Sequence, residues 1–421
     1  MLVDAWLPRA AGLAPQAIAV NNLSYGQLLI DAQCAARQLS ALGVVAGDRV
    51  ALVLPADNDF VVIFHAVLLL GAVAVPIDPR TPAGQREERA KGARVVVEGP
   101  LDGHQDPAAR LSATHDLAAV AVVLFTSGSS GSATAVELTY GNFWWSAAGS
   151  AVALGLDRRE RWLCCLPVSH VGGLSIILRS VIYGTEAIVH HGFELDRVVE
   201  QLRSSDGPTL ISLVPTTLQR LLDAGLEAPP ALRYALLGGG PISAGLLARA
   251  DAAAVPVASS YGMTEACSQI ATRGAPLFCT DIAFSEVDEM LVSGPTIAPQ
   301  LAPVLRTGDI GRRAVDGSVE VVGRRTETII SGGENVSPEV VENVIARHPA
   351  VADVAVVARP DEEWGEAVTA LVVLKADHDV DSDELLEFAS AELSPHERPK
   401  RIEFRGSLGR GETGKLKRRE L

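Results

Sequence analysis

The sequence predicts an α/β protein with a doubly wound, largely parallel sheet and a smaller C-terminal domain. Segments of helical and strand character alternate from residue 24 to about residue 256. Such alternation is typical of βαβ units, whose helices cover both faces of the sheet. The pattern changes near Glu286, where short strands with turn signals begin. A distinct block follows Thr326, so we place a domain boundary there, between residues 1–325 and 326–421.

The expected elements follow in chain order from apolar runs and cap residues. Ser24 is a candidate N-cap for a helix over residues 25–42, which stops at Gly43. Further helices are expected over residues 60–70, from Ser337 onward and over residues 382–393. Apolar runs predict strands over residues 50–54, 72–77, 118–124, 209–213, 234–237, 255–258, 351–357 and 368–374.

Composition and charge exclude several classes of protein. The 421 residues are 48% hydrophobic and 21% charged, which is enough apolar material for a large core. The net charge of -15 argues against a nucleic-acid-binding surface. The longest apolar run, residues 60–75, is too short for a membrane span. The five scattered cysteines and the absence of a basic-then-apolar leader predict reduced thiols and a cytoplasmic protein. Adjacent Cys164 and Cys165 are expected to be buried structural thiols.

The loop over residues 125–132 is the first candidate site. It follows an apolar strand and holds two glycines and five hydroxyl side chains. Glycines let backbone N–H groups converge on one ligand, and hydroxyls add further donors, which suits a phosphate. An ordinary Ser/Gly turn is the alternative. The candidate phosphate-binding residues are Thr126, Ser127, Gly128, Ser129 and Gly131.

Further short motifs follow this loop in a fixed order. They are LPVSHVGG from Leu166, LGGGP from Leu237, YGMTE from Tyr261, RTGD from Arg306, GR at Gly323 and ETGKLKRR from Glu412. The ordered set resembles the adenylate-forming superfamily of acyl-CoA synthetases, adenylation domains and luciferases, over nearly the whole chain. Within it, the segments RWLCCLPVSHVGGLSI, SLVPTTL, YGMTEACSQIAT and GRRTETIISGGENV are most similar to 2-succinylbenzoate–CoA ligases of menaquinone biosynthesis.

The resemblance implies a fold and a reaction. The fold is a large N-terminal domain of doubly wound sheets with a small β-barrel-like part, plus a small mobile α+β C-terminal domain. The reaction is that of an acid–thiol ligase, which forms a CoA thioester from a carboxylic acid through an acyl-AMP intermediate. ATP or AMP and Mg²⁺ are the implied cofactors, and CoA and a small carboxylic acid, or its acyl-AMP, are the implied partners. A homodimer is an additional expectation.

The resemblance also implies a role for individual residues. Thr264 would bind the α-phosphate and Glu265 would hold Mg²⁺, a cation that prefers hard oxygen ligands; a helix N-terminus capped by Thr264 is the alternative. Lys415 would bridge the substrate carboxylate and the α-phosphate. His170 would border the acyl pocket, with a core histidine as the alternative. The implied adenosine-binding residues are Gly239, Gly240, Pro241, Tyr261, Gly262, Asp309 and Arg324. The implied hinge is Thr326, and the implied CoA path is Gly332 and Gly333.

Tyr261 would stack on adenine and Asp309 would accept hydrogen bonds from the ribose hydroxyls, with Arg324 donating to the same region. The alternatives are a core aromatic residue for Tyr261, a strand-end turn for residues 238–240 and a plain β-turn for residues 307–309.

The sequence departs from the family pattern at the second half of the phosphate loop. Ala133, Thr134 and Ala135 replace the family's proline, lysine and glycine, and Glu137 adds a negative charge nearby. The interval between Glu265 and Asp309 is also short, which predicts a trimmed barrel. Three hypotheses follow: a complete ligase, a ligase that only transfers the acyl group of a supplied acyl-AMP to CoA, and a nucleotide-binding pseudoenzyme.

Overall fold

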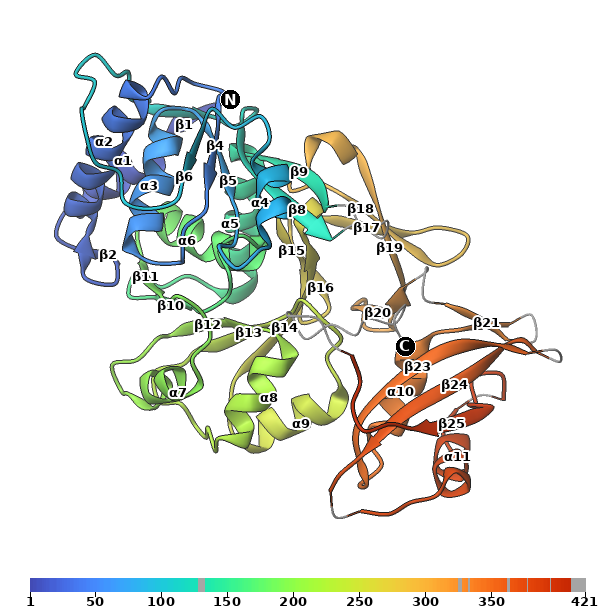
Figure 1. The fold of residues 1–421 in the computed structure, drawn as a ribbon. Coiled ribbons are helices and arrows are strands. Elements are labelled where there is room, and N and C mark those ends of the chain that lie inside the picture. The colour runs from blue at the N-terminus through green and yellow to red at the C-terminus, as the bar shows by residue number, and fades with distance from the viewer. Residues whose placement is uncertain are drawn as a thin grey trace. The chain divides into compact units, whose positions relative to one another are not determined.

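The computed structural model describes residues 1–127, 133–324, 328–331, 334–361, 364–376, 378–393 and 395–409 (Figure 1). The chain divides into two compact units. The first unit comprises Met1–Gly239, Ala250–Ile282 and Val292–Leu305. The second unit comprises Gly240–Arg249, Ala283–Leu291 and Arg306–Leu421. The boundary placed at Thr326 stays a prediction, because that residue lies outside the described part.

The first unit begins with a five-stranded sheet in the order β6-β4-β5-β8-β9. Its strands are β4 (Arg49–Leu52), β5 (Val73–Pro76), β6 (Val95–Val97), β8 (Val120–Ser127) and β9 (Ala133–Thr139). All neighbours are parallel except β8 and β9, which form an antiparallel hairpin. The accompanying helices are α1 (Trp6–Leu13), α2 (Tyr25–Ala41), α3 (Asn58–Leu69) and α4 (Ala83–Ala90). A small antiparallel pair joins β1 (Leu2–Asp4) and β7 (Thr114–Asp116).

Local chemistry explains the expected helix after Ser24. The Ser24 hydroxyl accepts the backbone N–H of Gln27, so Ser24 caps α2 as predicted. The helix ends at Ala41, one residue before the expected end.

A nine-stranded sheet is the larger part of the first unit, in the order β16-β15-β14-β13-β12-β10-β11-β2-β3. Its strands are β2 (Ile18–Val20), β3 (Leu23–Ser24), β10 (Arg161–Cys164), β11 (Glu186–Val189), β12 (Leu210–Leu213), β13 (Tyr234–Leu237), β14 (Val257–Met263), β15 (Ser268–Thr272) and β16 (Ala275–Pro276). The central strands are parallel, and β3, β15 and β16 are antiparallel at the edges. The connecting helices are α5 (Tyr140–Leu154), α6 (Val171–Tyr183), α7 (Leu195–Arg203), α8 (Pro215–Asp223) and α9 (Ala244–Ala252).

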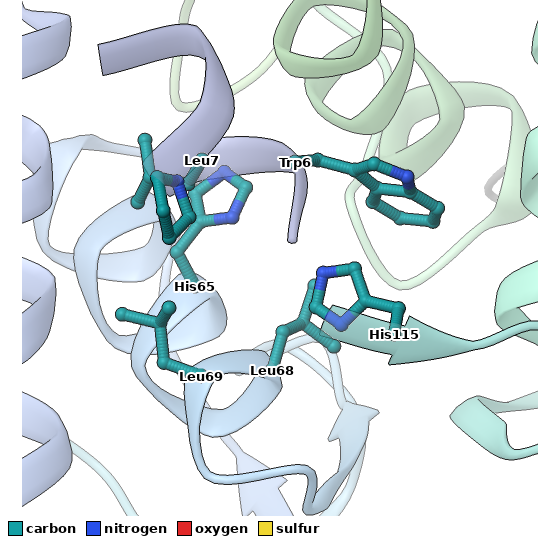
Figure 2. A pocket seen from close by; sticks show the side chains of 7 residues that line it. Trp6, Leu7, His65, Leu68, Leu69 and His115 are labelled. Atoms are coloured by element: carbon teal, nitrogen blue, oxygen red, sulfur yellow. The ribbon is translucent and has the colours of Figure 1, made fainter. Parts of the chain in front are cut away.

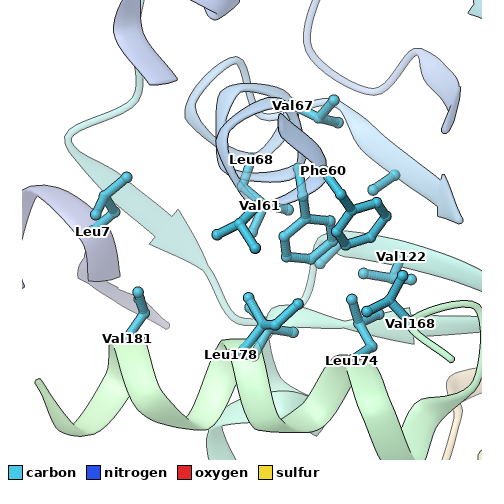
Figure 3. Close-up of a cluster of buried hydrophobic side chains, with 14 of the residues drawn as sticks. Leu7, Phe60, Val61, Val67, Leu68, Val122, Val168, Leu174, Leu178 and Val181 are labelled. Carbon is cyan, nitrogen blue, oxygen red and sulfur yellow. The ribbon is translucent and has the colours of Figure 1, made fainter. Parts of the chain in front are cut away.

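The main core lies between α3, α6 and the first sheet (Figure 3). Phe60 and Val61 of α3 face Leu174 and Leu178 of α6, and Val122 of β8 closes the cluster. These side chains are almost fully buried, and burial of a large apolar side chain contributes about 1.5–3 kcal/mol. This packing fixes α6, and with it the loop before α6, on the sheet.

The second unit combines short strands with a separate α+β block. Its first sheet has the order β17-β18-β19-β20, with β17 (Asp281–Phe284), β18 (Glu289–Ser293), β19 (Val304–Arg313) and β20 (Val319–Arg324). Its second sheet contains β21 (Ile329–Ser331), β22 (Glu334–Val336), β23 (Val351–Asp361), β24 (Gly365–Leu374) and β25 (Arg401–Phe404). The helices are α10 (Pro338–Ile345) and α11 (Ser382–Ser390). The predicted fold class is confirmed, and a four-stranded sheet stands where the barrel-like part was expected.

The cysteines agree with the expectation from composition. All five are free thiols, and Cys164 and Cys165 are buried. Burial raises the pKa of Cys165 to about 12. None of the helices in the described part of the chain has the length and apolarity that a bilayer crossing requires.

Candidate active site

The carboxyl ends of neighbouring parallel strands gather several predicted residues at one edge of the nine-stranded sheet. His170 follows β10, Gly239 follows β13, and Tyr261 lies near the end of β14. Crevices at such edges are the usual ligand sites of doubly wound sheets. A Cβ on Gly238 would lie 2.8 Å from the Ser260 carbonyl oxygen, so glycine is needed for this close approach. The approach places Gly238 directly beside Ser260, the residue before Tyr261.

Tyr261 is half-buried rather than a fully buried core residue, which agrees with a ring that can meet a ligand. Gly262 lies directly against β15, because a Cβ there would overlap the Ser268 carbonyl. Gly262 therefore serves the packing of two strands, whatever else it contacts. Gly240 and Pro241 follow Gly239 in the chain and belong to the second unit.

Thr264 and Glu265 lie in a short 3-10 turn, Thr264–Ala266, directly after β14. Met263 occupies the N-cap position, and no side chain caps the turn. The alternative interpretation of Thr264 as a helix cap is therefore wrong. The turn is held through its backbone: Cys267 N–H donates to the Thr264 carbonyl at 3.0 Å, and Ala298 N–H donates to the Glu265 carbonyl at 2.9 Å.

Buried side chains behind this turn were missed by the sequence analysis. The Ser146 hydroxyl donates to the Cys267 carbonyl at 2.6 Å, and the Arg179 guanidinium donates to Ser146 at 3.0 Å. Arg179 also lies 5.5 Å from the centre of the Trp162 ring. Burial lowers the pKa of Arg179. The available signal was a single charged residue inside the otherwise apolar helix α6.

The phosphate loop connects the two strands of the β8–β9 hairpin. The register pairs Thr126 with Thr134 and Ser127 with Ala133. Strand β9 lies against the Thr264–Ala266 turn, so the hairpin and the turn are neighbours. Gly128, Ser129 and Gly131 lie outside the described residues. Thr134, which stands where the family has lysine, is exposed on β9.

Glu137 does not add an unpaired negative charge to this hairpin. Its carboxylate accepts from the Arg49 guanidinium at 2.7 Å. Arg49 begins β4, which lies in the same sheet. The expected electrostatic effect of Glu137 on a bound phosphate is therefore reduced by its own partner.

His170 occupies the N-cap position of α6 without capping it, and it is exposed. The alternative of a core histidine is therefore wrong. The carboxylate of Asp78 lies close enough to interact electrostatically with His170. Hydrogen bonds from Arg80 to Asp78, at 2.7 and 3.0 Å, lower the pKa of the Asp78 carboxyl, and His170 lowers it further. Asp78 was not among the predicted residues.

Glu265 has the properties that a magnesium ligand needs. Its side chain is half-buried, and it shows no hydrogen bond or ion pair with any residue of the described ranges. No group of three acidic, histidine or cysteine side chains within these ranges forms a metal cage. Mg²⁺ characteristically binds through one or two carboxylates together with substrate phosphates and water. The residues present therefore fit a metal that arrives with a nucleotide.

Asp309 and Arg324 lie side by side in the second unit. They face each other across β19 and β20, and Arg324 Nε lies 2.6 Å from Asp309 Oδ1. Asp309 is buried, and Arg324 is half exposed. The structure thus brings together the two residues that the resemblance assigns to the ribose. The alternative interpretation of residues 307–309 as a plain β-turn is wrong, because all three residues lie within β19.

Four further predicted residues cannot be placed. Lys415, Thr326, Gly332 and Gly333 lie outside the described residues, and their roles stay predictions.

Three separate features agree with an adenylate-forming enzyme: the predicted residues at the strand ends of a doubly wound sheet, the β8–β9 hairpin against the Thr264–Ala266 turn, and, within the second unit, the Asp309–Arg324 pair. The family model of the AMP-binding enzymes matches residues 7–286, and the model of the AMP-binding enzyme C-terminal domain matches residues 340–415. The chain belongs to the AMP-binding enzyme family.

Curated relatives and solved structures match over the whole chain. A 2-succinylbenzoate–CoA ligase of Bacillus licheniformis is 33% identical and covers 100% of both chains. One of Geobacillus kaustophilus is 35% identical and covers 99% of this chain and 96% of its own. The o-succinylbenzoate CoA synthetase (MenE) of Bacillus subtilis, in complex with the acyl-adenylate intermediate OSB-AMP, has a TM-score of 0.91 at 30% identity and covers 100% of this chain and 98% of its own.

These matches confirm the resemblance and the class of enzyme, an acid–thiol ligase that forms a CoA thioester through an acyl-adenylate. They also confirm ATP or AMP and Mg²⁺ as cofactors, with CoA as a substrate; another structure of the Bacillus subtilis synthetase holds ATP and magnesium. The alignment with the Bacillus licheniformis ligase runs over 482 positions, whereas this chain has 421 residues. The relative therefore has segments that this chain lacks, in line with the shortened interval before Asp309.

Proposed function

We propose that this ligase converts 2-succinylbenzoate, or a closely related aromatic acid, to its CoA thioester and performs the adenylation itself. The observation that carries the proposal is the match to 2-succinylbenzoate–CoA ligases over the full length of both chains. The site supports it, since the hairpin, the Thr264–Ala266 turn and the Asp309–Arg324 pair each supply a group that an acyl-adenylate would contact.

Each described residue has a chemical task in this proposal. The Thr264 hydroxyl donates to the α-phosphate, on a turn that the bonds from Ala298 and Cys267 keep in place. Glu265 would hold Mg²⁺, whose positive charge would offset negative charge on the phosphates. Tyr261 and the backbone after Gly239 enclose the adenine, and Asp309 accepts from the ribose hydroxyls. His170 borders the acyl group, and the Asp78 carboxylate lies close enough to interact with it electrostatically.

Lys415 completes the proposed chemistry from the C-terminal tail. A cation between the carboxylate and the α-phosphate stabilises the charge that develops in the transition state. Thr326 as the hinge, Gly332 and Gly333 as the CoA path, and the boundary between residues 325 and 326 belong to the same proposal.

A second candidate function is a ligase that uses acyl-AMP supplied by another enzyme. The observation that favours it is Thr134, a neutral residue where the family has lysine. Loss of a charge-assisted hydrogen bond costs about 1.5–3 kcal/mol, which is about one to two decades of affinity or rate. Such a loss slows adenylation without abolishing it, so the complete ligase remains the better proposal.

Two assays on the full chain distinguish the candidates. The first measures ATP–pyrophosphate exchange dependent on 2-succinylbenzoate, with benzoate for comparison. The second measures CoA thioester formation from synthetic 2-succinylbenzoyl-AMP. Exchange that Lys415→Ala abolishes supports the complete ligase. Rapid use of acyl-AMP without exchange over a broad panel of acids would establish the second candidate. Inactivity in both assays, with AMP still bound, would indicate a pseudoenzyme.

A cytoplasmic location and a homodimer, both expected from the sequence, stay predictions. The five free thiols are consistent with the location.

A further inference from the structure

Glu289 is a buried carboxylate at the start of β18, in the second unit. Only 1% of the residue is exposed. Its backbone is fixed by Ser285, whose hydroxyl accepts the Glu289 N–H at 3.1 Å and whose own N–H donates to the Glu289 carbonyl at 2.9 Å. The side chain therefore leaves a well-anchored backbone.

Both oxygens of the Glu289 carboxylate contact the segment that leads to Asp309. The Gly308 N–H donates to Oε1 at 3.2 Å, and the Arg306 guanidinium forms an ion pair with Oε2. Gly308 has a φ of +72°, in the left-handed region that glycine adopts most readily. Glu289 thus holds the irregular step in the backbone immediately before Asp309.

Thr307 adds a second connection between these strands. Its hydroxyl donates to the Met290 carbonyl at 2.9 Å and accepts the Asp309 N–H at 3.1 Å. The backbone N–H groups of Gly308 and Asp309 thus each donate to a side-chain oxygen, of Glu289 and Thr307 respectively. The direction of the Asp309 carboxylate depends on these bonds.

A buried carboxylate is not the residue that stability alone would favour. Desolvation of the charge offsets the gain from its ion pair, so an apolar side chain would stabilise the strand as well or better. An apolar side chain could not accept the Gly308 N–H. We infer that Glu289 is a positioning residue of the nucleotide site, which holds the irregular segment 306–308 of β19 so that Asp309 meets the ribose hydroxyls. This inference rests on the ribose-binding role of Asp309 in the proposed function.

The test compares two ligands on the full chain by calorimetry: AMP and 2′,3′-dideoxy-AMP, which lacks both ribose hydroxyls. Asp309→Ala should weaken AMP binding about tenfold to a hundredfold, the range for a charged hydrogen bond, and leave the dideoxy ligand nearly unchanged. Glu289→Ala should reproduce most of this selective loss. The double variant, with both Glu289→Ala and Asp309→Ala, should bind AMP no more weakly than Asp309→Ala alone. Glu289→Gln keeps an acceptor for the Gly308 N–H, so it should lose less affinity for AMP than Glu289→Ala.

Glu320→Ala is the matched control. It removes an acidic partner of β19 within the same sheet, since Glu320 of β20 pairs with Arg312 of β19 at 2.7 Å, and both side chains are exposed. This variant should bind both ligands like the unaltered protein. If Glu289→Ala does not fold, Thr307→Val decides instead, because it removes the acceptor for the Asp309 N–H and should give the same selective loss.

Two results would overturn the inference alone. In the first, Glu289→Ala weakens AMP and the dideoxy ligand equally, which indicates a general structural role. In the second, Glu289→Ala binds AMP normally while Asp309→Ala does not. If Asp309→Ala itself binds AMP normally, the ribose role of Asp309 in the proposed function is wrong, and the inference falls with it.

Discussion

Charged side chains near the candidate site differ in whether the protein itself neutralises them. The carboxylates of Asp78, Glu137 and Asp309 each lie within 3 Å of an arginine nitrogen. Glu265 has no such contact in the part of the chain that the structure describes. A half-buried carboxylate without a partner retains a strong preference for a cation. Of these four carboxylates, Glu265 is therefore the one that we propose as the Mg²⁺ ligand.

Glu265→Gln should therefore change the magnesium dependence of the enzyme. The amide keeps the size of the side chain but carries no charge for the cation. We expect adenylation to fall about a hundredfold, because metal stabilisation of phosphoryl charge contributes several kcal/mol, and the Mg²⁺ concentration for half-maximal activity to rise. Magnesium titrations of ATP–pyrophosphate exchange measure both effects.

Glu200→Gln, an exposed change on α7, is the control and should behave like the unaltered protein. An unchanged magnesium titration in Glu265→Gln would show that another group binds the metal.

At the scale of elements, hydrophobic periodicity predicts helices and strands well, but it does not predict the contacts that hold them together. Strand β13 has the expected bounds, and α2 and β12 differ by one residue. The sequence analysis does not predict strand β9. Its core residues Val136 and Leu138 alternate with Glu137, which is the period of a strand. The Ser/Gly loop directly before these residues hides the pattern, because it favours a longer loop. The bonds from Ser146 to Cys267 and from Asn142 to Ile297 join residues more than 100 positions apart. No local pattern encodes such pairs, so the sequence identified Thr264 and Glu265 but not what holds them.

The β8–β9 hairpin offers a gain-of-function prediction. Thr134→Lys restores the family's cation at an exposed position opposite Thr126. A charge-assisted bond to phosphate contributes about 1.5–3 kcal/mol, so kcat/KM for ATP in the exchange assay should rise by about tenfold or more. Thioester formation from synthetic acyl-AMP should not change, because that step does not involve the outer phosphates.

The control for this gain is Thr114→Lys, which adds the same charge at an exposed position on β7. If both lysines raise kcat/KM equally, the gain comes from a less negative net charge, since the protein carries a charge of -15, and not from the position of residue 134. If neither does, the hairpin of this chain does not place residue 134 at the nucleotide.

At the scale of the molecule, one buried polar cluster links the N-terminal helix α1 to α3 and β7. Trp6 of α1, His65 of α3 and His115 of β7 line a cavity of about 10 Å³ (Figure 2). His115 stacks on Tyr140 at 4.2 Å, and Trp6 meets the His115 ring edge-on at 4.9 Å. Predicted site residues are not among those that line this cavity. The cluster therefore bears on the stability of the whole chain rather than on catalysis.

These two histidines should make the protein less stable in mild acid. Burial lowers the pKa of His65 to about 3 and that of His115 to about 4, whereas the unfolded chain titrates near 6.5. Between about pH 6.5 and 4 the unfolded state thus binds more protons, so the free energy of unfolding falls as the pH falls, by about 1.4 kcal/mol per pH unit for each histidine.

His65→Gln removes one of the two titrations. Urea unfolding at pH 7.0, 6.0 and 5.0, followed by tryptophan fluorescence, should show a shallower loss of stability in acid for this variant. The fluorescence reports mainly the first unit, because Trp6, Trp144, Trp145 and Trp162 lie there and only Trp364 lies in the second. His104→Gln, a change of an exposed histidine, should keep the slope of the unaltered protein. Equal slopes for all three proteins would mean that His65 is protonated in the folded state, contrary to its burial.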